Sequence, residues 1–358
     1  MPSLKEIKGR INSISSTLAI TSAMKMVASA KLQKAQMAIQ NMLPYERRLH
    51  SMLIDLMGAM NISAAASEDG SVRGSGSAER GFDQSGDRLS LSNRHDLAGM
   101  DGAYSLMAQR EVRKVAIVAF ASNSSLCGAF NSNVIREATA VINEYRASGL
   151  GDADITVYSV GRKMAEAMKK LGFPSPADFT KMSDSPSYEA ASALAQELLD
   201  GFVSGRFDKV ELVYNHYKST SSQPTIRQTY LPLSLADATA DIQVGKITDS
   251  ASESDTNRGA ETVGAPVVRQ GSPTTEDLIV EPSKEALIAI LLPKVIRLRI
   301  FTTLLDSAAA EHAARTVAMQ LATDNGNDLL QELTLEYNKG RQQKITSEIL
   351  DIVGGSMQ

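Results

Sequence analysis

Residues 322–355 read ATDNGNDLLQELTLEYNKGRQQKITSEILDIVGG, and this stretch is expected to form one long helix. Its apolar residues recur at intervals of three and four, which is the period of an amphipathic helix. The stretch has no Cys and no His, and it ends on Gly354 and Gly355, which suit a helix C-cap. So long a helix with no residue suited to catalysis predicts a structural role.

The helical pattern begins well before this stretch. Ser283 is expected to cap its N-terminus, without a capping box because Ala286 stands at the position that Glu would need. Pro293 is expected to bend the helix. The small residues that would let another helix approach are Ala308 to Ala310, Ala313, Ala314, Ala322 and Gly326. The apolar stripe consists of Leu305, Ala308, Met319, Ala322, Leu329, Leu333, Tyr337 and Ile345.

The N-terminal part of the chain carries a second pattern of this kind. Apolar residues step by three and four from Leu4 onward, and a helix continuous to about residue 60 would be roughly 90 Å long. Polar residues interrupt the seam at Thr21, Lys25 and Glu46, and Pro44 is expected to kink or break the helix. The seam consists of Leu4, Ile7, Ile11, Ile14, Leu18, Ala28, Leu32, Ala35, Ile39, Met42, Leu49, Leu53, Leu56 and Met60.

Apolar stripes of this kind usually belong to the core of a helical bundle. Here, however, the two helices lie at opposite ends of the chain, and each is too long for a compact domain. We therefore expect the two ends of the chain to pair as an antiparallel two-helix coiled coil.

The middle of the chain alternates strand-like and helix-like segments, which predicts an α/β domain with a mostly parallel sheet covered by helices. Residues 225–233 are expected to add an edge strand, which suits Pro232. The expected buried strands are 112–120, 154–161 and 209–217, and the expected helices are 134–147, 162–171 and 188–203.

Two segments break this alternation because they are rich in Ser, Gly and Asp. Neither can bury enough apolar surface to offset the entropy of ordering it, so both are expected to be mobile surface insertions. The chain then divides into an N-terminal coiled-coil helix at 1–62, an insert at 63–110, the α/β domain at 111–235, an insert at 236–276 and a C-terminal coiled-coil helix at 277–358.

Composition excludes several classes of protein. A net charge of −4 over 358 residues argues against a chain that binds nucleic acid along its whole length. One Cys and four His argue against a disulfide framework and a structural zinc site, and they indicate a reducing compartment. The N-terminus lacks the apolar core of a secretory signal, and no apolar run approaches the length of a transmembrane helix.

One loop, Ser122–Asn133, lies between a strand and a helix, where α/β folds often bind anions. It matches no phosphate-binding motif, and Cys127 has no His or Asn partner visible in the sequence. A tight turn around a buried Cys is the favoured interpretation, and a nucleotide loop or a nucleophile is the alternative. His50, His216 and His312 lack the spacing of metal ligands and are expected at the surface or at an interface. We predict no catalytic, cofactor-binding or metal-binding residue.

The first fifty residues are basic, with eight cations against two Glu, a balance of +6. The cations are Lys5, Lys8, Arg10, Lys25, Lys31, Lys34, Arg47 and Arg48, and the anions are Glu6 and Glu46. A solvated helix face would explain this excess, and a surface that meets an acidic protein partner is the sharper hypothesis. Nucleic acid fits less well because no aromatic residues interleave with the basic ones.

The gamma subunit of F-type ATP synthases resembles this chain in three stretches. These are LKEIKGRINSISSTLAITSAMKMVASAKLQKAQ at 4–36, ELVYNHYKSTSSQPTIRQTYLPL at 211–233 and EHAARTVAMQLATDNGNDLLQELTLEYNKGRQQKITSEILDIVGG at 311–355. The resemblance covers nearly the whole chain apart from the two inserts. In one departure, the family's Asp-Arg-Gly-Leu-Cys-Gly turn reads Asn-Ser-Ser-Leu-Cys-Gly at residues 123–128, so the roles of its Asp and Arg are not carried over.

The resemblance implies the same fold, an α/β domain plus a long antiparallel two-helix coiled coil formed by the N- and C-terminal helices. It implies a central rotor shaft that enters a hexamer of alpha and beta subunits and meets the epsilon subunit and the c-ring. Rotation of the c-ring, driven by protons or sodium, would then be coupled to conformational cycling of the catalytic beta subunits. The chain would need no cofactor. It would associate peripherally, through the complex, with the cytoplasmic side of a bacterial inner (plasma) membrane.

The resemblance also assigns partner contacts. Those with the beta subunit fall on Met24, Lys25, Arg315, Arg341, Gln342, Thr346 and Glu348. Those with the c-ring or epsilon subunit fall on Tyr214, Asn215, His216 and Tyr217. The planar guanidinium of Arg315 suits charge-assisted hydrogen bonds. An ordinary surface role is the alternative for each of them.

Two other functions are weighed against the rotor shaft. A cytosolic coiled-coil scaffold with an α/β head would share the long helices, but it has no reason to carry these terminal motifs. A nucleotide-binding α/β enzyme would share the sheet. Nucleotide binding by the isolated chain separates the enzyme from the shaft, because the shaft is expected to bind none.

Overall fold

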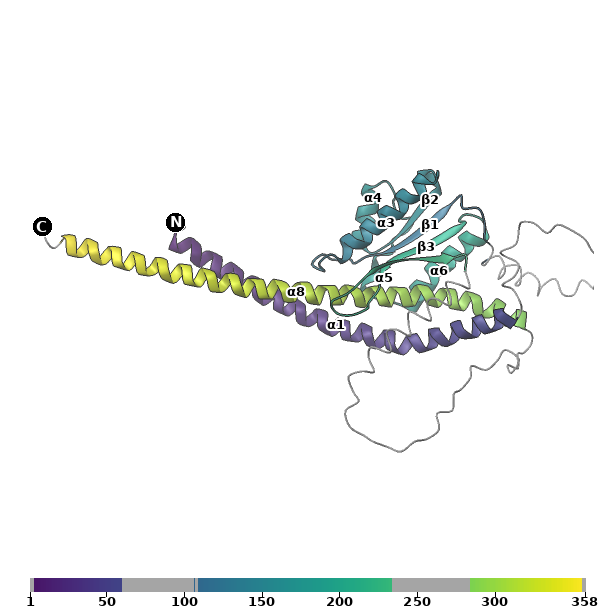
Figure 1. Ribbon diagram of the computed structural model, residues 1–358, viewed down its shortest axis with the longest axis horizontal. Helices are drawn as coiled ribbons and strands as arrows, with labels where there is room; N and C mark the ends of the chain where they lie inside the picture. The colour runs from purple at the N-terminus through teal and green to yellow at the C-terminus, as the bar shows by residue number, and fades with distance from the viewer. Residues whose placement is uncertain (1–2, 60–105, 107–108, 234–283, 356–358) are drawn as a thin grey trace, which may run out of the picture.

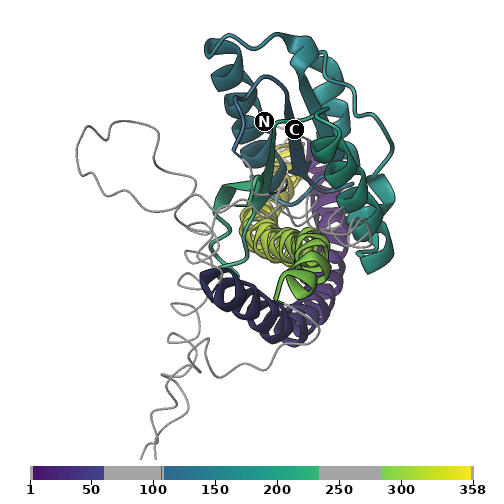
Figure 2. The same ribbon diagram turned by 90° about the vertical axis from the view of Figure 1, so that its right-hand side faces the viewer.

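The computed structural model describes residues 3–59, 106, 109–233 and 284–355. Two long helices, α1 (Leu4–Ala59) and α8 (Lys284–Gly355), run side by side and form what we call the shaft. An α/β domain, which we call the head, packs against one end of the shaft (Figure 1). Seen from the end, the head lies to one side of both helices (Figure 2).

Both prolines lie inside continuous helices. The Ser3 Oγ atom caps α1 by accepting a hydrogen bond from the backbone N–H of Glu6 at 3.2 Å. The break that Pro44 could have caused does not occur, although α1 is bowed (Figure 1). Pro44 lies on the exposed side of the helix, where the carbonyl group that has lost its donor can be hydrated. α8 likewise continues through Pro293, and its expected cap, Ser283, lies outside the described residues.

Two of the three polar interruptions in the α1 seam face a polar partner on α8. The hydroxyl groups of Thr21 and Thr323 lie 3.1 Å apart. The Thr302 hydroxyl donates to a carboxylate oxygen of Glu46 at 3.0 Å. Because buried polar groups are tolerated when they are hydrogen-bonded, these residues fit the seam without breaking it.

The apolar stripe of α8 differs from the prediction at Ala322, Leu329 and Ile345, which are exposed in this chain. Leu305 and Met319 are buried as expected. Ile345 lies beyond the point at which α1 begins, so no helix covers it. Ala322 and Leu329 lie off the line of contact, because α8 meets a single partner helix there and not a bundle.

The sheet of the head has the order β2-β1-β3-β4. β1 pairs in parallel with β2 and β3, and β4 pairs antiparallel with β3 at the edge, which confirms the predicted mostly parallel sheet and its edge strand. The strands are β1 (Val115–Phe120), β2 (Ile155–Val160), β3 (Lys209–Asn215) and β4 (Thr225–Leu231).

Alternate residues of β1 enter two different cores. Ile117 and Ala119 pack with α3 (Phe130–Ala147) and α4 (Arg162–Lys170) on one face. Val118 and Phe120 pack with α6 (Tyr188–Val203) and α8 on the other face. The sheet is therefore docked directly on the shaft. The remaining described elements are α5 (Thr180–Asp184) and the short 3-10 helix η3 (Asp152–Asp154).

The two inserts expected at 63–110 and 236–276 lie outside the described residues, apart from Leu106, Gln109 and Arg110. Met60 of the predicted seam lies outside them as well. The domain boundaries given above therefore stay predictions.

Candidate functional site

The shaft has one antiparallel register. Thr21 meets Thr323, and Leu4 lies over Gly340, where a β-carbon would stand 3.1 Å from the Leu4 Cδ2 atom. Leu32 packs on Ala313 further along. Because Leu4 begins α1, the rest of α8 after Gly340 continues without a partner helix.

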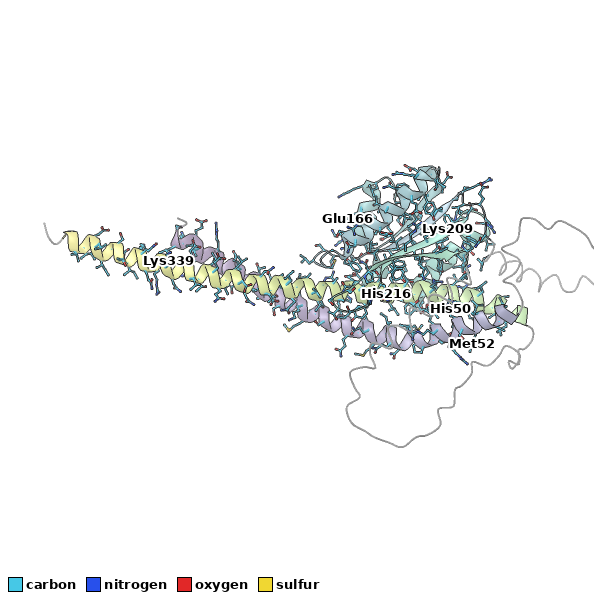
Figure 3. The ribbon with its side chains drawn as sticks, viewed as in Figure 1. His50, Met52, Glu166, Lys209, His216 and Lys339 are labelled. Atoms are coloured by element: carbon cyan, nitrogen blue, oxygen red, sulfur yellow. The ribbon has the colours of Figure 1, made fainter. Side chains whose placement is uncertain are left out.

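Residues 341–355, which we call the tip, extend past α1 by about 15 residues, or roughly 22 Å. Lys339, labelled in Figure 3, lies just before the tip. All side chains from 341 to 353 are exposed. The large apolar ones are Ile345, Ile349, Leu350, Ile352 and Val353. Apolar side chains gathered in this way mark a surface that meets another protein.

Four of the expected beta-subunit contacts lie in the tip and are exposed: Arg341, Gln342, Thr346 and Glu348. The Thr346 hydroxyl donates to the backbone carbonyl of Gln342 at 2.9 Å. Glu348 lies 3.7 Å from Lys344, but both side chains are so exposed that water screens the pair. These side chains are therefore accessible to a partner.

Met24 and Lys25 lie on the paired part of the shaft and are partly exposed. They are about 20 residues from the start of α1, so roughly 30 Å of shaft separates them from the tip. The structure therefore does not bring them together with the residues of the tip. A partner that contacts both groups would have to follow the shaft along its length.

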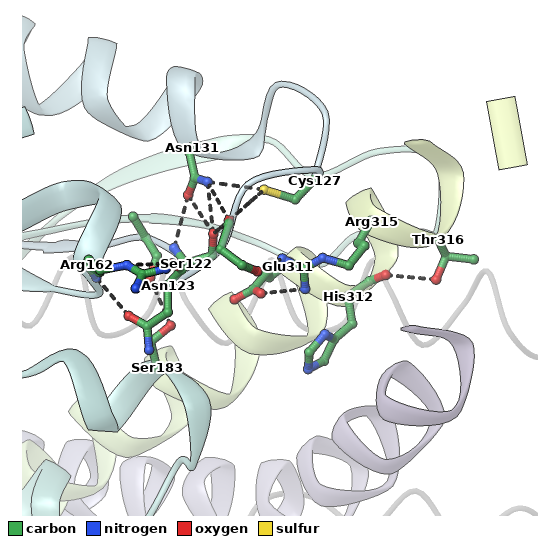
Figure 4. A network of polar contacts seen from close by, with 12 residues as sticks. Ser122, Asn123, Cys127, Asn131, Arg162, Ser183, Glu311, His312, Arg315 and Thr316 are labelled. Atoms are coloured by element: carbon green, nitrogen blue, oxygen red, sulfur yellow. Dashed lines mark hydrogen bonds and ion pairs between the residues drawn. The ribbon is translucent and has the colours of Figure 1, made fainter. Parts of the chain in front are cut away.

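Arg315 is engaged within the chain. Its guanidinium donates to the carboxylate of Glu311 at 2.6 Å (Figure 4). It also donates to the hydroxyl of Ser124 at 2.8 Å. The Arg315 side chain is 11% exposed and that of Glu311 is 10% exposed. Burial raises the pKa of Glu311, although Arg315 opposes the shift. Ser124 belongs to the head and Arg315 to the shaft, so this contact joins the two.

The expected contact segment at the end of β3 is also held within the chain. Tyr214 and Asn215 are buried, and Asn215 donates to the backbone carbonyl of Phe130 at 3.0 Å. The His216 Nδ1 atom lies 2.6 Å from the carboxylate of Asp306 in α8. This hydrogen bond raises the pKa of His216. The segment therefore contacts the shaft, and its role towards the c-ring or epsilon subunit stays a prediction.

The loop after β1 is a tight turn around a buried Cys, as favoured from the sequence. Cys127 is 1% exposed, and the side-chain amide of Asn131 donates to its Sγ atom at 3.2 Å (Figure 4). Asn131 also accepts a hydrogen bond from the backbone N–H of Ser122 at 3.0 Å. Leu126 and Gly128 have φ angles of 68° and 58°, which close the turn.

The residue that replaces the family's Asp in this turn forms hydrogen bonds inside the head. The Asn123 side chain accepts from the backbone N–H of Arg162 at 2.8 Å and donates to the carbonyl of Thr180 at 2.7 Å. The Arg162 guanidinium donates back to the Asn123 carbonyl at 2.7 Å. The uncharged Asn therefore satisfies both a donor and an acceptor, which an Asp carboxylate could not do.

Two of the histidines lie at the interface between helices. His50 on α1 is buried, and burial together with Arg299 lowers its pKa to about 4. Figure 3 labels His50 between the two helices, at the end of the shaft that carries the head. Burial, with the charges of Arg315 and Lys31, likewise lowers the pKa of His312 to about 4. Both imidazoles are therefore neutral at pH 7.

The sheet carries a buried ionic cluster that was not predicted from the sequence. Glu211 in β3 is 2% exposed and accepts hydrogen bonds from Lys209, Arg227 and Tyr145, each at 2.7 Å. Burial alone would raise the pKa of Glu211, but these three donors lower it. The only signal in the sequence is a charged residue inside an otherwise apolar strand.

Within the described parts of the chain, no group of His, Cys, Asp and Glu side chains is arranged to hold a metal ion. The same parts contain no helix that is long and apolar enough to span a membrane. The candidate functional features of the described chain are the shaft, its tip and the contacts between head and shaft.

A family model described as ATP synthase matches residues 3–357. The ATP synthase gamma chain of Phocaeicola vulgatus is 47% identical over 100% of both chains, and that of Flavobacterium johnsoniae is 36% identical over 99% of this chain and 98% of its own. The chain belongs to the ATP synthase gamma chain family. The family's function is that of the central-stalk subunit of ATP synthase, which carries no catalytic site of its own.

The fold is also found in a solved ATP synthase. A chain from the Euglena gracilis mitochondrial ATP synthase, in a structure described as OSCP/F1/c-ring in rotational state 3, has a TM-score of 0.52. It covers 99% of this chain and 93% of its own, at 19% identity, and so confirms the fold. A match of gamma chains over the full length does not favour the coiled-coil scaffold, because the scaffold has no reason to share the terminal motifs.

Proposed function

We propose that this chain is the rotor shaft of a bacterial F-type ATP synthase at the cytoplasmic side of the inner membrane. Its tip and shaft enter a hexamer of alpha and beta subunits, and its head meets the epsilon subunit and the c-ring. Rotation of the c-ring by protons or sodium turns the shaft and moves each beta subunit through its conformations in turn.

The observation that carries this proposal is the tip. A helix that continues about 22 Å past its partner gains nothing from packing within its own chain. Its exposed isoleucines are stabilised only when another protein covers them. A narrow opening in a ring of subunits fits a single helix of this kind.

We assign the beta-subunit contacts to the accessible residues. These are Met24, Lys25, Arg341, Gln342, Thr346 and Glu348. A contact that forms in some rotor positions and not in others biases a beta subunit between its states. Arg315 is also a proposed beta-subunit contact, and residues 214–217 are proposed contacts of the c-ring or epsilon subunit, although Arg315 and Asn215 already have partners within the chain.

The test is purification of the affinity-tagged chain from its native membranes, followed by mass spectrometry and by measurements of ATP hydrolysis and ion pumping. We expect alpha, beta, epsilon and c subunits to co-purify, and we expect no turnover by the chain alone. Pumping in sodium-free buffer distinguishes protons from sodium. ATP turnover by the isolated chain, or a purified chain without alpha and beta subunits, would contradict the proposal.

A further inference from the structure

Head and shaft are joined by two kinds of contact. The apolar kind is broad, since residues of α6 and of β1 pack on α8 in one cluster. Apolar attraction has no preferred direction, so on its own it holds two elements together without fixing how one is turned against the other. Hydrogen bonds and ion pairs are directional and supply that constraint.

Several polar contacts join the head to α8. The Tyr230 hydroxyl donates to the Ile296 carbonyl at 2.9 Å, and Arg297 donates to the side chain of Gln196 at 2.5 Å. Two contacts further along α8 are called anchors here. In the first anchor, Asp306 accepts from the backbone N–H of Tyr217 at 2.9 Å and lies 2.6 Å from the His216 Nδ1 atom. In the second anchor, Arg315 binds Ser124 of the head at 2.8 Å while Glu311, one turn earlier on α8, holds the guanidinium at 2.6 Å.

The anchors lie at opposite margins of the contact between head and α8. Asp306 and Arg315 are nine residues apart, which at 3.6 residues per turn places them about 180° apart around the helix axis. Between them, Ala310 and Ala314 face the head and pack in one apolar cluster with Cys127 and Phe130. A contact at one margin would let α8 roll beneath the head, whereas contacts at both margins resist rolling in either sense.

Each anchor is backed by a rigid part of the head. Tyr217 is the second residue after the end of β3, and its ring packs against both helices. Its hydroxyl accepts a hydrogen bond from Gln36 of α1 at 2.6 Å. Ser124 belongs to the tight turn around Cys127, and its backbone carbonyl accepts from the hydroxyl of Ser122 at 2.6 Å. Force on either anchor therefore passes into the sheet and not into a free loop.

On the basis of the proposed function, we infer that the Asp306 and Arg315 anchors form a clamp that transmits torque between head and shaft. The head meets the c-ring and the shaft meets the catalytic subunits, so the torque of every rotation passes through the contact between head and shaft. His216, Tyr217 and Ser124 hold the clamp from the head, and Glu311 orients Arg315. These are positioning residues, and none of them touches nucleotide.

The first test measures how many ions are pumped per ATP hydrolysed against an opposing ion gradient. In membrane vesicles with the complete complex, Asp306→Ala with Arg315→Ala is expected to lower the number of ions pumped per ATP hydrolysed several-fold as the opposing gradient grows. Each single change should have a smaller effect, because one margin is still held. Arg315→Lys should restore coupling only in part, since an ammonium lacks the fork that reaches Glu311 and Ser124 together. Arg113→Ala, which removes an exposed ion pair elsewhere on the head, is the control.

The second test measures how freely the head moves relative to the shaft in the purified full-length chain. Cys127 is the only cysteine and is buried, so spin labels can be placed at Leu171→Cys on the head and at Met37→Cys on the shaft, both exposed sites. The distribution of label distances should be narrow in the parent and broad in the Asp306→Ala, Arg315→Ala variant. An unchanged distribution, or a coupling ratio that stays normal at the largest gradient, would overturn the clamp. Failure of the parent chain to assemble with alpha and beta subunits would instead contradict the proposed function.

Discussion

Leu18 of α1 lies directly over Gly326 of α8, and a β-carbon on that glycine would stand 2.7 Å from the Leu18 Cδ2 atom. The two helices can approach this closely only because position 326 has no side chain. Gly326 costs α8 roughly 1 kcal/mol in helix propensity relative to Ala. Close packing with Leu18 compensates for that loss and sets the register of the shaft.

Gly326→Val is therefore expected to destabilise the shaft. The added methyl groups would push Leu18 out of the seam, at a cost of about 1–3 kcal/mol for overpacking. Thermal unfolding followed by helical circular dichroism should show a lower midpoint. Gly9→Ala is the matched control, because a β-carbon at Gly9 meets nothing within 4 Å. That change should raise the midpoint slightly, and a fall of equal size in both variants would contradict the role given to Leu18.

Glu211→Gln should destabilise the head strongly. It would take the buried carboxylate away from Lys209 and Arg227, whose side chains are each 27% exposed. Losing one partner of a fully buried ion pair costs about 3–5 kcal/mol, which is an upper bound here because Arg227 keeps its pair with Glu144. The folded state lowers the pKa of Glu211, so the stability that this carboxylate provides is present above its ordinary pKa and is lost as the pH falls through the lower folded value. Urea unfolding between pH 7 and pH 3 should show this acid-dependent loss in the parent chain and a smaller one in the variant. Glu111→Gln, in an exposed ion pair, should change little.

His50 is expected to make the chain sensitive to mild acid. Its pKa is about 4 when folded against an ordinary value of 6.5, so the unfolded chain takes up the proton first. Stability should therefore fall as the pH drops from about 6.5 to 4, by at most roughly 3 kcal/mol from this residue. His50→Met should reduce the dependence, and His312, with a similar shift, should account for part of what is left.

The same substitution tests how well His50 is accommodated. Among the described residues, its buried Nε2 atom has no hydrogen-bond partner. Removing such a group in favour of an apolar side chain of similar size is expected to be neutral or stabilising at pH 7. A large loss of stability at neutral pH would indicate that the His50 imidazole makes a stabilising polar contact.

Replacing Ile345, Ile349 and Ile352 together by Ser should separate folding from assembly. These side chains share one face of the tip and contact nothing within their own chain that buries them, so the thermal midpoint of the isolated chain should hardly change. Co-purification of the alpha and beta subunits should decrease, because the apolar surface that they cover is gone. Leu171→Ser, at an exposed site on the head, is the control. Normal assembly of the triple variant would show that the tip is not a contact surface.

The sequence predicted the elements better than the contacts between them. The seam from Leu4 to Leu56 and the β-branched strands are local patterns, and both elements form where those patterns lie. The register of the shaft depends on one glycine, Gly326, and a glycine inside a helix does not indicate which residue will lie over it. Thr21 and Glu46 read as interruptions because their partners lie on the other helix.

In the candidate site, too, the sequence predicted which residues are accessible better than it predicted their contacts. Accessible residues such as Gln342 and Thr346 follow from the resemblance and from the exposed face of a helix. The burial of Arg315 could not be predicted, because its partner Ser124 lies in a loop that periodicity does not position. Glu311, one turn before Arg315, was a visible signal for a pair on one helix, but nothing in the sequence placed that pair against the head.

The pairing of the two chain ends also sets the order in which the protein can fold. Thr21 and its partner Thr323 are separated by 302 residues. At a synthesis rate of about 5–20 residues per second, α1 waits roughly 15–60 s on the ribosome before the helix that covers it has emerged. During that time its apolar seam faces solvent, while the strands of the head have all emerged and can already pair. The shaft must therefore form last, together with the face of the sheet that packs on α8. α1 is the segment for which a chaperone or an early-binding subunit would matter most.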